Sequence, residues 1–217
     1  VDSGVQRVVY AASSSAYGNT NALVKVESLQ PKPISPYAVS KLAGEYLLQA
    51  FSACYGIETV GLRYFNVFGE RQDPDSAYSG VIAKFSKSML QGIQPTIFGD
   101  GTTARDFTYV ANAVQANLLA ATMPFEANGA IFNVACGHST TLNDLVHHIN
   151  AFLGTHLVPN YAPNRPGDVQ YSCADITLAR ETFGYEPEAD FVSGLRKTLE
   201  WYRSTLDRAD ESQVNLA

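Results

Sequence analysis

Two short apolar runs with the character of β-strands, separated by one long helical segment, constrain the fold of this chain most. The first, RVVYAA at residues 7–12, is an apolar run with β-branched residues, and the second, ETVGLRYF at 58–65, has the same character. Between them, apolar residues recur at helical spacing from Tyr37 to Tyr55, and Gly56 follows as a stop signal. The recurring residues are Val39, Leu42, Ala43, Tyr46, Leu47, Ala50, Phe51 and Cys54. A strand, a helix and a second strand in this order form a right-handed crossover, which predicts an α/β fold with a parallel sheet covered on both faces.

Past Gly69 the predicted elements become shorter. They are a helix at 81–90, a strand at 95–99, a turn at 99–103, a helix at 110–121, a strand at 131–135, a helix at 142–153 and, after a Pro-rich loop, two C-terminal helices. We expect residues 70–217 to form mainly a smaller α/β lobe beside the sheet, with some segments returning to it. The first four residues have the pattern of a helix end, and the polar tail after Leu206 is expected to be frayed.

Composition and charge argue against several classes of function. The net charge of −6 disfavours a nucleic-acid surface, which needs clustered Lys and Arg to displace counterions. No apolar run approaches the roughly 20 residues of a membrane span, and the first residues do not form a signal peptide. Cys54, Cys136 and Cys173 lie far apart and form no CxxC pair, as in reduced cytoplasmic proteins. We therefore expect a cytoplasmic protein with no metal site and no membrane or nucleic-acid partner.

The strongest candidate for chemistry is a set of hydroxyls, a phenol and an ammonium around the first crossover. Ser13, Ser14 and Ser15 follow the first strand, and Tyr37 and Lys41 share one face at the start of the helix. A phenol with a pKa near 10 acts as a base at neutral pH only if its anion gains about 4 kcal/mol of selective stabilisation. Lys41 can supply part of that, and Ser13 can share a hydrogen bond with the phenolate and a reacting hydroxyl. An isolated YxxxK is more often a helix start with an aromatic anchor, so the context of the motif decides.

That context is a series of motifs in fixed order along nearly the whole chain. They read AASSSAYG, PISPYAVSKLAGE, LRYFNVFG, GDGTTARDFTYV, RPGD and CAD. Together they resemble the extended short-chain dehydrogenases/reductases of the nucleotide-sugar epimerase branch. The resemblance implies a doubly wound parallel-sheet (Rossmann) domain with a UDP-sugar lobe, NAD as cofactor, and Ser13, Tyr37 and Lys41 as catalytic residues. It implies that Tyr37 removes the sugar 4-hydroxyl proton while hydride passes to NAD, and that the 4-keto sugar turns and takes the hydride back on its other face.

The glycine-rich turn of such a domain is missing from the sequence. A GxGxxG turn between the first strand and the first helix lets a dinucleotide pyrophosphate sit on a helix N-terminus, and no strand-to-helix turn here carries it. We therefore expect residues 1–69 to be the second half of the NAD-binding domain, with about 100 further residues upstream. The chain alone should hold NAD weakly. By resemblance, the cofactor contacts are Ala11, Ala12, Tyr37, Lys41, Tyr64 and Phe65.

The resemblance also assigns a UDP-sugar site. It implies that Arg105 and Arg165 hold the diphosphate, which suits the paired hydrogen bonds of a guanidinium group. Asp168 would accept from the ribose hydroxyls, Phe98 would lie against uracil, and Asn66 would contact the substrate. An interlobe salt bridge stays open as an alternative for each arginine. The whole implied set is Ser13, Ser14, Ser15, Asn66, Gly80, Val81, Lys84, Thr96, Phe98, Arg105, Arg165, Asp168 and Ser172.

One position bears on the choice of sugar. In the family, a bulky Tyr two residues before the AD of the CAD motif closes the space at C2 of the sugar, and Ser172 stands there in this sequence. A small hydroxyl leaves room for an N-acetyl group, so UDP-GlcNAc and UDP-GalNAc are the expected substrates. UDP-glucose and UDP-galactose would be accepted less efficiently, because an enlarged pocket rejects smaller ligands only weakly.

Other functions stay open at this point. A 4,6-dehydratase would need an Asp-Glu pair directly after Ser13, where Ser14 and Ser15 stand, so dehydration is disfavoured. The remaining alternatives are a UDP-glucuronate 4-epimerase and a non-catalytic remnant that binds a sugar nucleotide, which gains weight only if no upstream half exists. The family further implies a homodimer formed through the helix that begins at Tyr37, with Leu48 and Phe51 on its outer face, and a place in polysaccharide synthesis.

Overall fold

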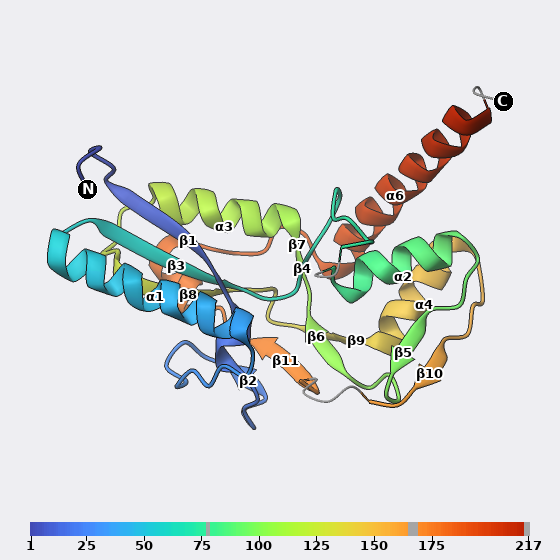
Figure 1. Cartoon of the computed structure of the whole chain (residues 1–217), viewed down its shortest axis with the longest axis horizontal. Helices are drawn as coiled ribbons and strands as arrows, with labels where there is room; N and C mark the ends of the chain where they lie inside the picture. Colours follow the sequence, from blue (N-terminus) through green and yellow to red (C-terminus); the bar gives the residue numbers. More distant parts are fainter. Residues whose placement is uncertain (77–78, 165–168, 215–217) are drawn as a thin grey trace.

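A three-stranded parallel sheet forms the centre of one of the two parts of the fold. The computed structural model describes residues 1–76, 79–164 and 169–214. Helix α1 covers one face of the sheet and helix α3 the other (Figure 1). The strands, in their order across the sheet, are β1 (Arg7–Ser13), β3 (Glu58–Tyr64) and β8 (Asn128–Val134). The predicted α/β fold with a covered parallel sheet is confirmed.

Helix α1 (Pro36–Tyr55) starts and stops where its sequence favours it. The Ser35 hydroxyl accepts a hydrogen bond from the Ala38 N–H at 3.1 Å, which satisfies one of the free donors of the first turn. Gly56 ends the helix at φ 67°, a left-handed conformation that costs glycine little. These local signals explain why the predicted and observed helices nearly coincide.

The side of α1 that faces the sheet is, however, not the apolar stripe that reveals the helix in the sequence. The stripe residues Val39, Ala43, Tyr46, Leu47, Ala50, Phe51 and Cys54 are all exposed. The buried residues are Ala38, Glu45, Leu48 and Ser52. Leu48 is only 8% exposed, so the expectation that it lies on the outer face is wrong, whereas Phe51 is exposed as expected. Glu45 can be buried because it pairs with Arg63 of β3 at 2.7 Å.

On the opposite face, helices α3 (Val110–Thr122) and α5 (Thr177–Phe183) pack against the sheet. Phe132 of β8 and Phe183 of α5 meet edge to face, with 4.9 Å between ring centroids, a favourable geometry for aromatic rings. The surrounding core contains Val60, Leu62, Phe65, Val134 and Tyr185. Segments from both ends of the sequence therefore build this core.

A second group of helices stands apart from the sheet (Figure 1). These are α2 (Val81–Leu90), α4 (Leu142–Leu153) and α6 (Phe191–Val214). They enclose a second core that includes Phe68, Ile82, Phe107, Leu145 and Leu195. Two short parallel pairs lie beside it: β4 (Val67–Phe68) with β7 (Thr108–Tyr109), and β5 (Thr96–Phe98) with β10 (Asn160–Ala162).

A four-stranded sheet connects the two groups. Its order is β2 (Val24–Lys25), β11 (Tyr171–Ala174), β6 (Ala104–Asp106) and β9 (Ser139–Thr141), and only the β6–β9 pair is antiparallel. These strands were not predicted, because runs of two to four residues carry no readable periodicity. A short 3-10 helix, η1 (Ser14–Tyr17), follows β1.

The C-terminal helix extends further than expected. The backbone of α6 continues as a helix to Val214, eight residues past the point after which fraying was expected. The first residues form a turn, closed by a 3.1 Å hydrogen bond from the Gly4 N–H to the Val1 carbonyl.

Candidate active site

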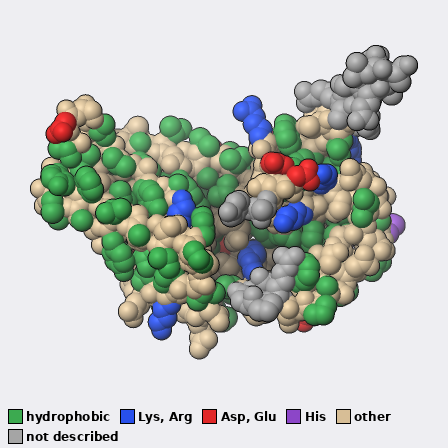
Figure 2. All heavy atoms as spheres, in the orientation of Figure 1, with side chains coloured by type: hydrophobic (Ala, Val, Ile, Leu, Met, Phe, Trp, Pro, Cys, Tyr) green, Lys and Arg blue, Asp and Glu red, His purple; other side chains and the backbone are tan. Residues whose placement is uncertain are grey.

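A cavity of about 820 Å³ opens where β1 and β3 end. Ser13 and Tyr64, the last residues of these strands, are register partners. Figure 2 shows the molecular surface hollowed between the sheet and the second group of helices, with Lys and Arg side chains in the hollow. The carboxyl ends of parallel strands are where open α/β sheets bind their ligands, so this cavity is the candidate active site.

The three residues predicted to be catalytic all line this cavity. The Lys41 Nζ donates a hydrogen bond to the Ala11 carbonyl at 2.8 Å and lies 5.8 Å from the centre of the Tyr37 ring. The Ser13 hydroxyl oxygen accepts from the Ser15 hydroxyl at 2.8 Å. Tyr37 is 52% exposed, so its phenol is accessible to a ligand. A hydroxyl, a phenol and an ammonium thus surround one open space, the set that proton transfer to or from a sugar hydroxyl needs.

The residues predicted to contact NAD lie on the same wall. Ala11, Ala12, Tyr64 and Phe65 line the cavity together with Tyr37 and Lys41. The Asn117 amide donates a hydrogen bond to the Tyr64 hydroxyl at 2.7 Å and so holds the ring in place, and burial raises the pKa of Tyr64. The small side chains of Ala11 and Ala12 leave room at the strand end. These residues fit the nicotinamide end of a dinucleotide.

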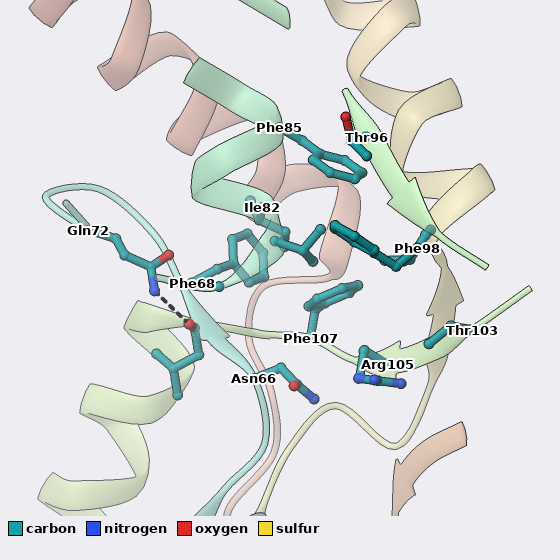
Figure 3. Close-up of a pocket in the computed structure, with 14 residues that line it drawn as sticks. Asn66, Phe68, Gln72, Ile82, Phe85, Thr96, Phe98, Thr103, Arg105 and Phe107 are labelled. Atoms are coloured by element: carbon teal, nitrogen blue, oxygen red, sulfur yellow. Dashed lines mark hydrogen bonds between the residues drawn. The ribbon is translucent and has the colours of Figure 1, made fainter. Parts of the chain in front are cut away.

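A second, narrower cavity of about 240 Å³ adjoins the first. Asn66, Val67, Gln72, Gly80 and Arg105 line both, and Val81 and Thr96 line the narrower one. Figure 3 shows aromatic rings gathered between α2 and the strands β5 and β6: Phe68, Phe85, Phe98 and Phe107. A space walled by aromatic rings, with a guanidinium group at its border, suits a planar base next to a phosphate.

Asn66 lies in the passage between the two cavities in a strained conformation. Its φ of 37° is in the left-handed region, which residues other than glycine rarely adopt. Its amide donates a hydrogen bond to the Asp106 carbonyl at 2.8 Å, which holds this conformation. Strain of this kind collects at functional sites.

Ser172 lies on the wall of the larger cavity, beside Arg105. It is 9% exposed and is the register partner of Arg105 in the β11–β6 pair. The neighbouring Asp106 is fully buried, and its carboxylate accepts hydrogen bonds from the N–H groups of Cys136, Gly137 and Ala174 at 2.9, 3.0 and 3.2 Å. Burial still raises the pKa of Asp106 to about 6. This carboxylate fastens β6, which carries Arg105, to two other segments.

Not every predicted residue comes to the site. Lys84 is exposed on α2 and lines neither cavity. Arg165 and Asp168 lie outside the described residues. Ser14 and Ser15 do line the larger cavity.

Sequence reasoning missed several lining residues. Phe68 and Phe107 stand inside the motifs LRYFNVFG and GDGTTARDFTYV, so their proximity to the site could have been inferred. Lys25 and Gln72 carry no such signal. Among the residues with a described structure, no cluster of His, Cys, Asp or Glu could hold a metal ion, and no helix is long and apolar enough to cross a membrane. The cysteines are unpaired.

The fold and the cavity define an α/β protein of the Rossmann type with a nucleotide-sized site at the ends of its strands. A model of the NAD dependent epimerase/dehydratase family matches residues 1–135, and the chain belongs to that family. The family resemblance inferred from the motifs is therefore confirmed, and the cofactor of the family is NAD.

Among its relatives, a putative UDP-glucose 4-epimerase of Methanocaldococcus jannaschii is 38% identical over 201 residues, which cover 92% of this chain and 64% of the relative. The structure of a UDP-N-acetylglucosamine 4-epimerase from Methanobrevibacter ruminantium M1, in complex with UDP-N-acetylmuramic acid, is similar with a TM-score of 0.89 and 38% identity, covering 94% and 65% of the two chains. The structure of MoeE5 in complex with UDP-glucuronic acid and NAD is similar with a TM-score of 0.85 and 35% identity, and the match covers 94% of this chain and 67% of MoeE5. The chain spans about two thirds of the length of these proteins.

Proposed function

We propose that this chain carries the catalytic and substrate-binding part of an NAD-dependent UDP-sugar 4-epimerase that interconverts UDP-GlcNAc and UDP-GalNAc. One observation carries the proposal: Ser13, Tyr37 and Lys41 line the same cavity as Arg105 and Ser172. Residues suited to moving a proton at a sugar hydroxyl therefore share a space with residues suited to binding a sugar diphosphate.

In this mechanism the side chains of the chain position the sugar and move one proton. Tyr37 takes the proton of the sugar 4-hydroxyl, and the Lys41 ammonium lies 5.8 Å from the centre of its ring. Ser13 donates a hydrogen bond to the same sugar oxygen and keeps it oriented. A bound NAD would supply the hydride acceptor and donor for C4, and Ala11, Ala12 and Tyr64 would line its nicotinamide end. Phe98 and the rings around it receive the base, and Arg105 neutralises the diphosphate at the border of the two cavities.

The preference for an N-acetylated sugar rests on Ser172. This small residue lies on the wall of the larger cavity, where a bulky side chain would narrow the space. An acetamide group can occupy that space and hydrogen-bond to the Ser172 hydroxyl. UDP-glucose and UDP-galactose are accepted as weaker substrates.

A second candidate is a UDP-glucuronate 4-epimerase, favoured by the charge of the cavity. Lys41 and Arg105 are among the described lining residues, and no Asp or Glu is. Such a lining can also accept a carboxylate on the sugar. The solved complex of MoeE5 contains UDP-glucuronic acid.

We also propose that the protein forms a homodimer through α1 and works in a reducing, cytoplasmic compartment. The exposed apolar residues Val39, Tyr46, Leu47, Phe51 and Tyr55 on α1 support the dimer, because an apolar stripe of this extent on one helix is typical of an interface. The unpaired cysteines support the proposed reducing compartment.

We divide the chain into residues 1–69, which carry the catalytic set, and 70–217, which mainly bind the UDP-sugar.

The deciding experiment uses the full-length gene product. UDP-GlcNAc is added without external NAD, and the anomeric proton signals of UDP-GalNAc are followed by NMR. UDP-glucose and UDP-glucuronate are run in parallel to rank the candidates, and Tyr37→Phe and Ser172→Tyr are the matched variants.

We expect UDP-GalNAc to form, Tyr37→Phe to abolish its formation, and Ser172→Tyr to lose the N-acetylated substrates while it keeps UDP-glucose. Faster conversion of UDP-glucuronate than of UDP-GlcNAc would favour the second candidate. Binding of UDP-sugars without any conversion, even with NAD supplied, would refute the epimerase function and favour a binding protein.

A further inference from the structure

Strand β11 changes its pairing partner at the residue on which substrate choice rests. Tyr171 and Ser172 pair with β6, whereas Cys173 and Ala174 pair with β2 on the other side. Backbone groups at such a change of partner need other hydrogen bonds if they are buried. Side chains supply them: the Ser139 hydroxyl donates to the Ser172 carbonyl at 2.9 Å.

The Tyr171 carbonyl, next to Ser172, is held by a buried lysine. The Lys25 Nζ donates hydrogen bonds to this carbonyl at 3.0 Å and to the Ala22 carbonyl at 2.7 Å. Lys25 is 3% exposed, and burial lowers its pKa. A lysine this deeply buried is rare, because taking an ammonium group out of water costs free energy that an apolar side chain of the same size would not cost.

The position of Lys25 indicates why an ammonium stands there. It lines the larger cavity together with Ser172 and Arg105, and its carbonyl partners lie in two segments far apart in the sequence. It therefore joins the loop before β2 to the start of β11. Two of its three N–H donors are used in this way.

We propose that Lys25 is a positioning residue for sugar selection: by holding the Tyr171 carbonyl it fixes Ser172 on the cavity wall, and so sets the discrimination at C2 of the sugar. This inference rests on the proposed function, since Ser172 selects a sugar only if the cavity binds one. Lys25 acts through Ser172 and has no part in the proton transfer by Tyr37.

The test compares variants of the full-length protein with two substrates, UDP-GlcNAc and UDP-glucose. Lys25→Met keeps the length of the side chain and removes its donors, Lys25→Arg keeps donors, and Lys32→Met is the control at an exposed lysine. For Lys25→Met we expect KM for UDP-GlcNAc to rise about tenfold, the size of one lost hydrogen bond, while KM for UDP-glucose and both kcat values change by less than about threefold. Lys25→Arg should restore most of the selectivity, and Lys32→Met should leave it unchanged.

A double-variant cycle shows whether Lys25 acts through Ser172. In a Ser172→Ala background, Lys25→Met should shift the ratio of the two KM values little, because the group that it positions is gone. The inference would be overturned if the two substitutions changed the ratio of the KM values independently, so that their fold-changes multiply in the double variant. An equal rise of KM for both sugars would overturn it as well. If Lys25→Met does not fold, Lys25→Gln takes its place, and unchanged selectivity there overturns the inference equally.

The failure of this inference can be told apart from the failure of the proposed function. Wild-type protein that binds both UDP-sugars and converts neither refutes the epimerase. Dissociation constants of the two UDP-sugars, measured by calorimetry for wild type and Lys25→Met, then still decide the role of Lys25. A selective loss of UDP-GlcNAc binding supports it, and an equal loss refutes it.

Discussion

The buried ion pair between helix α1 and strand β3 gives a prediction whose size follows from the structure. Arg63 donates two hydrogen bonds to the Glu45 carboxylate, at 2.9 and 2.7 Å, and the two side chains are 4% and 3% exposed. The guanidinium carbon also lies 4.5 Å from the centre of the Tyr17 ring. Glu45→Gln removes the counter-charge and leaves the guanidinium buried.

Breaking a buried pair from one side costs about 3–5 kcal/mol, because the remaining charge stays out of water without a partner. In the described structure one guanidinium nitrogen of Arg63 already has no hydrogen-bond partner, so few other contacts offset the loss of the Glu45 carboxylate. For a chain of this size, each kcal/mol lowers Tm by about 2–4 °C, so we expect Glu45→Gln to lower Tm by about 6–20 °C.

The assays are thermal and chemical denaturation followed by circular dichroism, with a double variant and an exposed pair as controls. Replacing Glu45 and Arg63 together by Leu should recover most of the lost stability, because the desolvation of both charges disappears with the pair. Glu186→Gln, which breaks the exposed pair with Arg180, should leave the unfolding free energy unchanged within error. A loss below about 1 kcal/mol for Glu45→Gln, or a double variant as unstable as the sum of the single ones, would refute the reasoning.

Three further predictions concern other parts of the chain. Burial raises the pKa of Asp106 to about 6, so the native state keeps a proton that the unfolded chain loses near pH 4. The free energy of unfolding of the wild type, minus that of Asp106→Ala, should therefore fall by about 3 kcal/mol as the pH rises from about 4 to 7. Urea unfolding measures this difference at each pH, and a difference that stays constant contradicts the prediction. Gly129→Ala would place a Cβ 2.7 Å from the Gln49 Cα at a residue with φ 75°, and it should lower the free energy of unfolding by about 2–4 kcal/mol. Gly154→Ala, at φ 69° with open space around the new Cβ, should lower it by about 1 kcal/mol. Equal losses of stability in the two variants would count against the steric argument. Leu47→Glu on the exposed face of α1 should convert the proposed homodimer to a monomer in sedimentation experiments, and a persistent dimer would place the interface elsewhere.

Much of the candidate site could be inferred from sequence because its residues stand in ordered motifs next to strand ends. Ser13 follows a β-branched run, and Tyr37 and Lys41 follow a helix cap, so local signals place all three near the carboxyl edge of the sheet. Lys25 could not be found in this way. It reaches the site through a strand pairing with β11, nearly 150 residues further along the chain, and no local pattern encodes that contact.

Helix α1 separates what the sequence determined from what only the tertiary structure decided. Periodicity, the Ser35 cap and Gly56 fixed where the helix begins and ends, because these depend on backbone geometry within a few residues. Which face meets the sheet was decided by a distant partner: Glu45 is buried because Arg63 of β3 lies opposite it, and the apolar stripe is left on the surface. Hydrophobic periodicity reports that one face of a helix is apolar. Whether that face meets the core of its own chain depends on contacts that a local pattern does not contain.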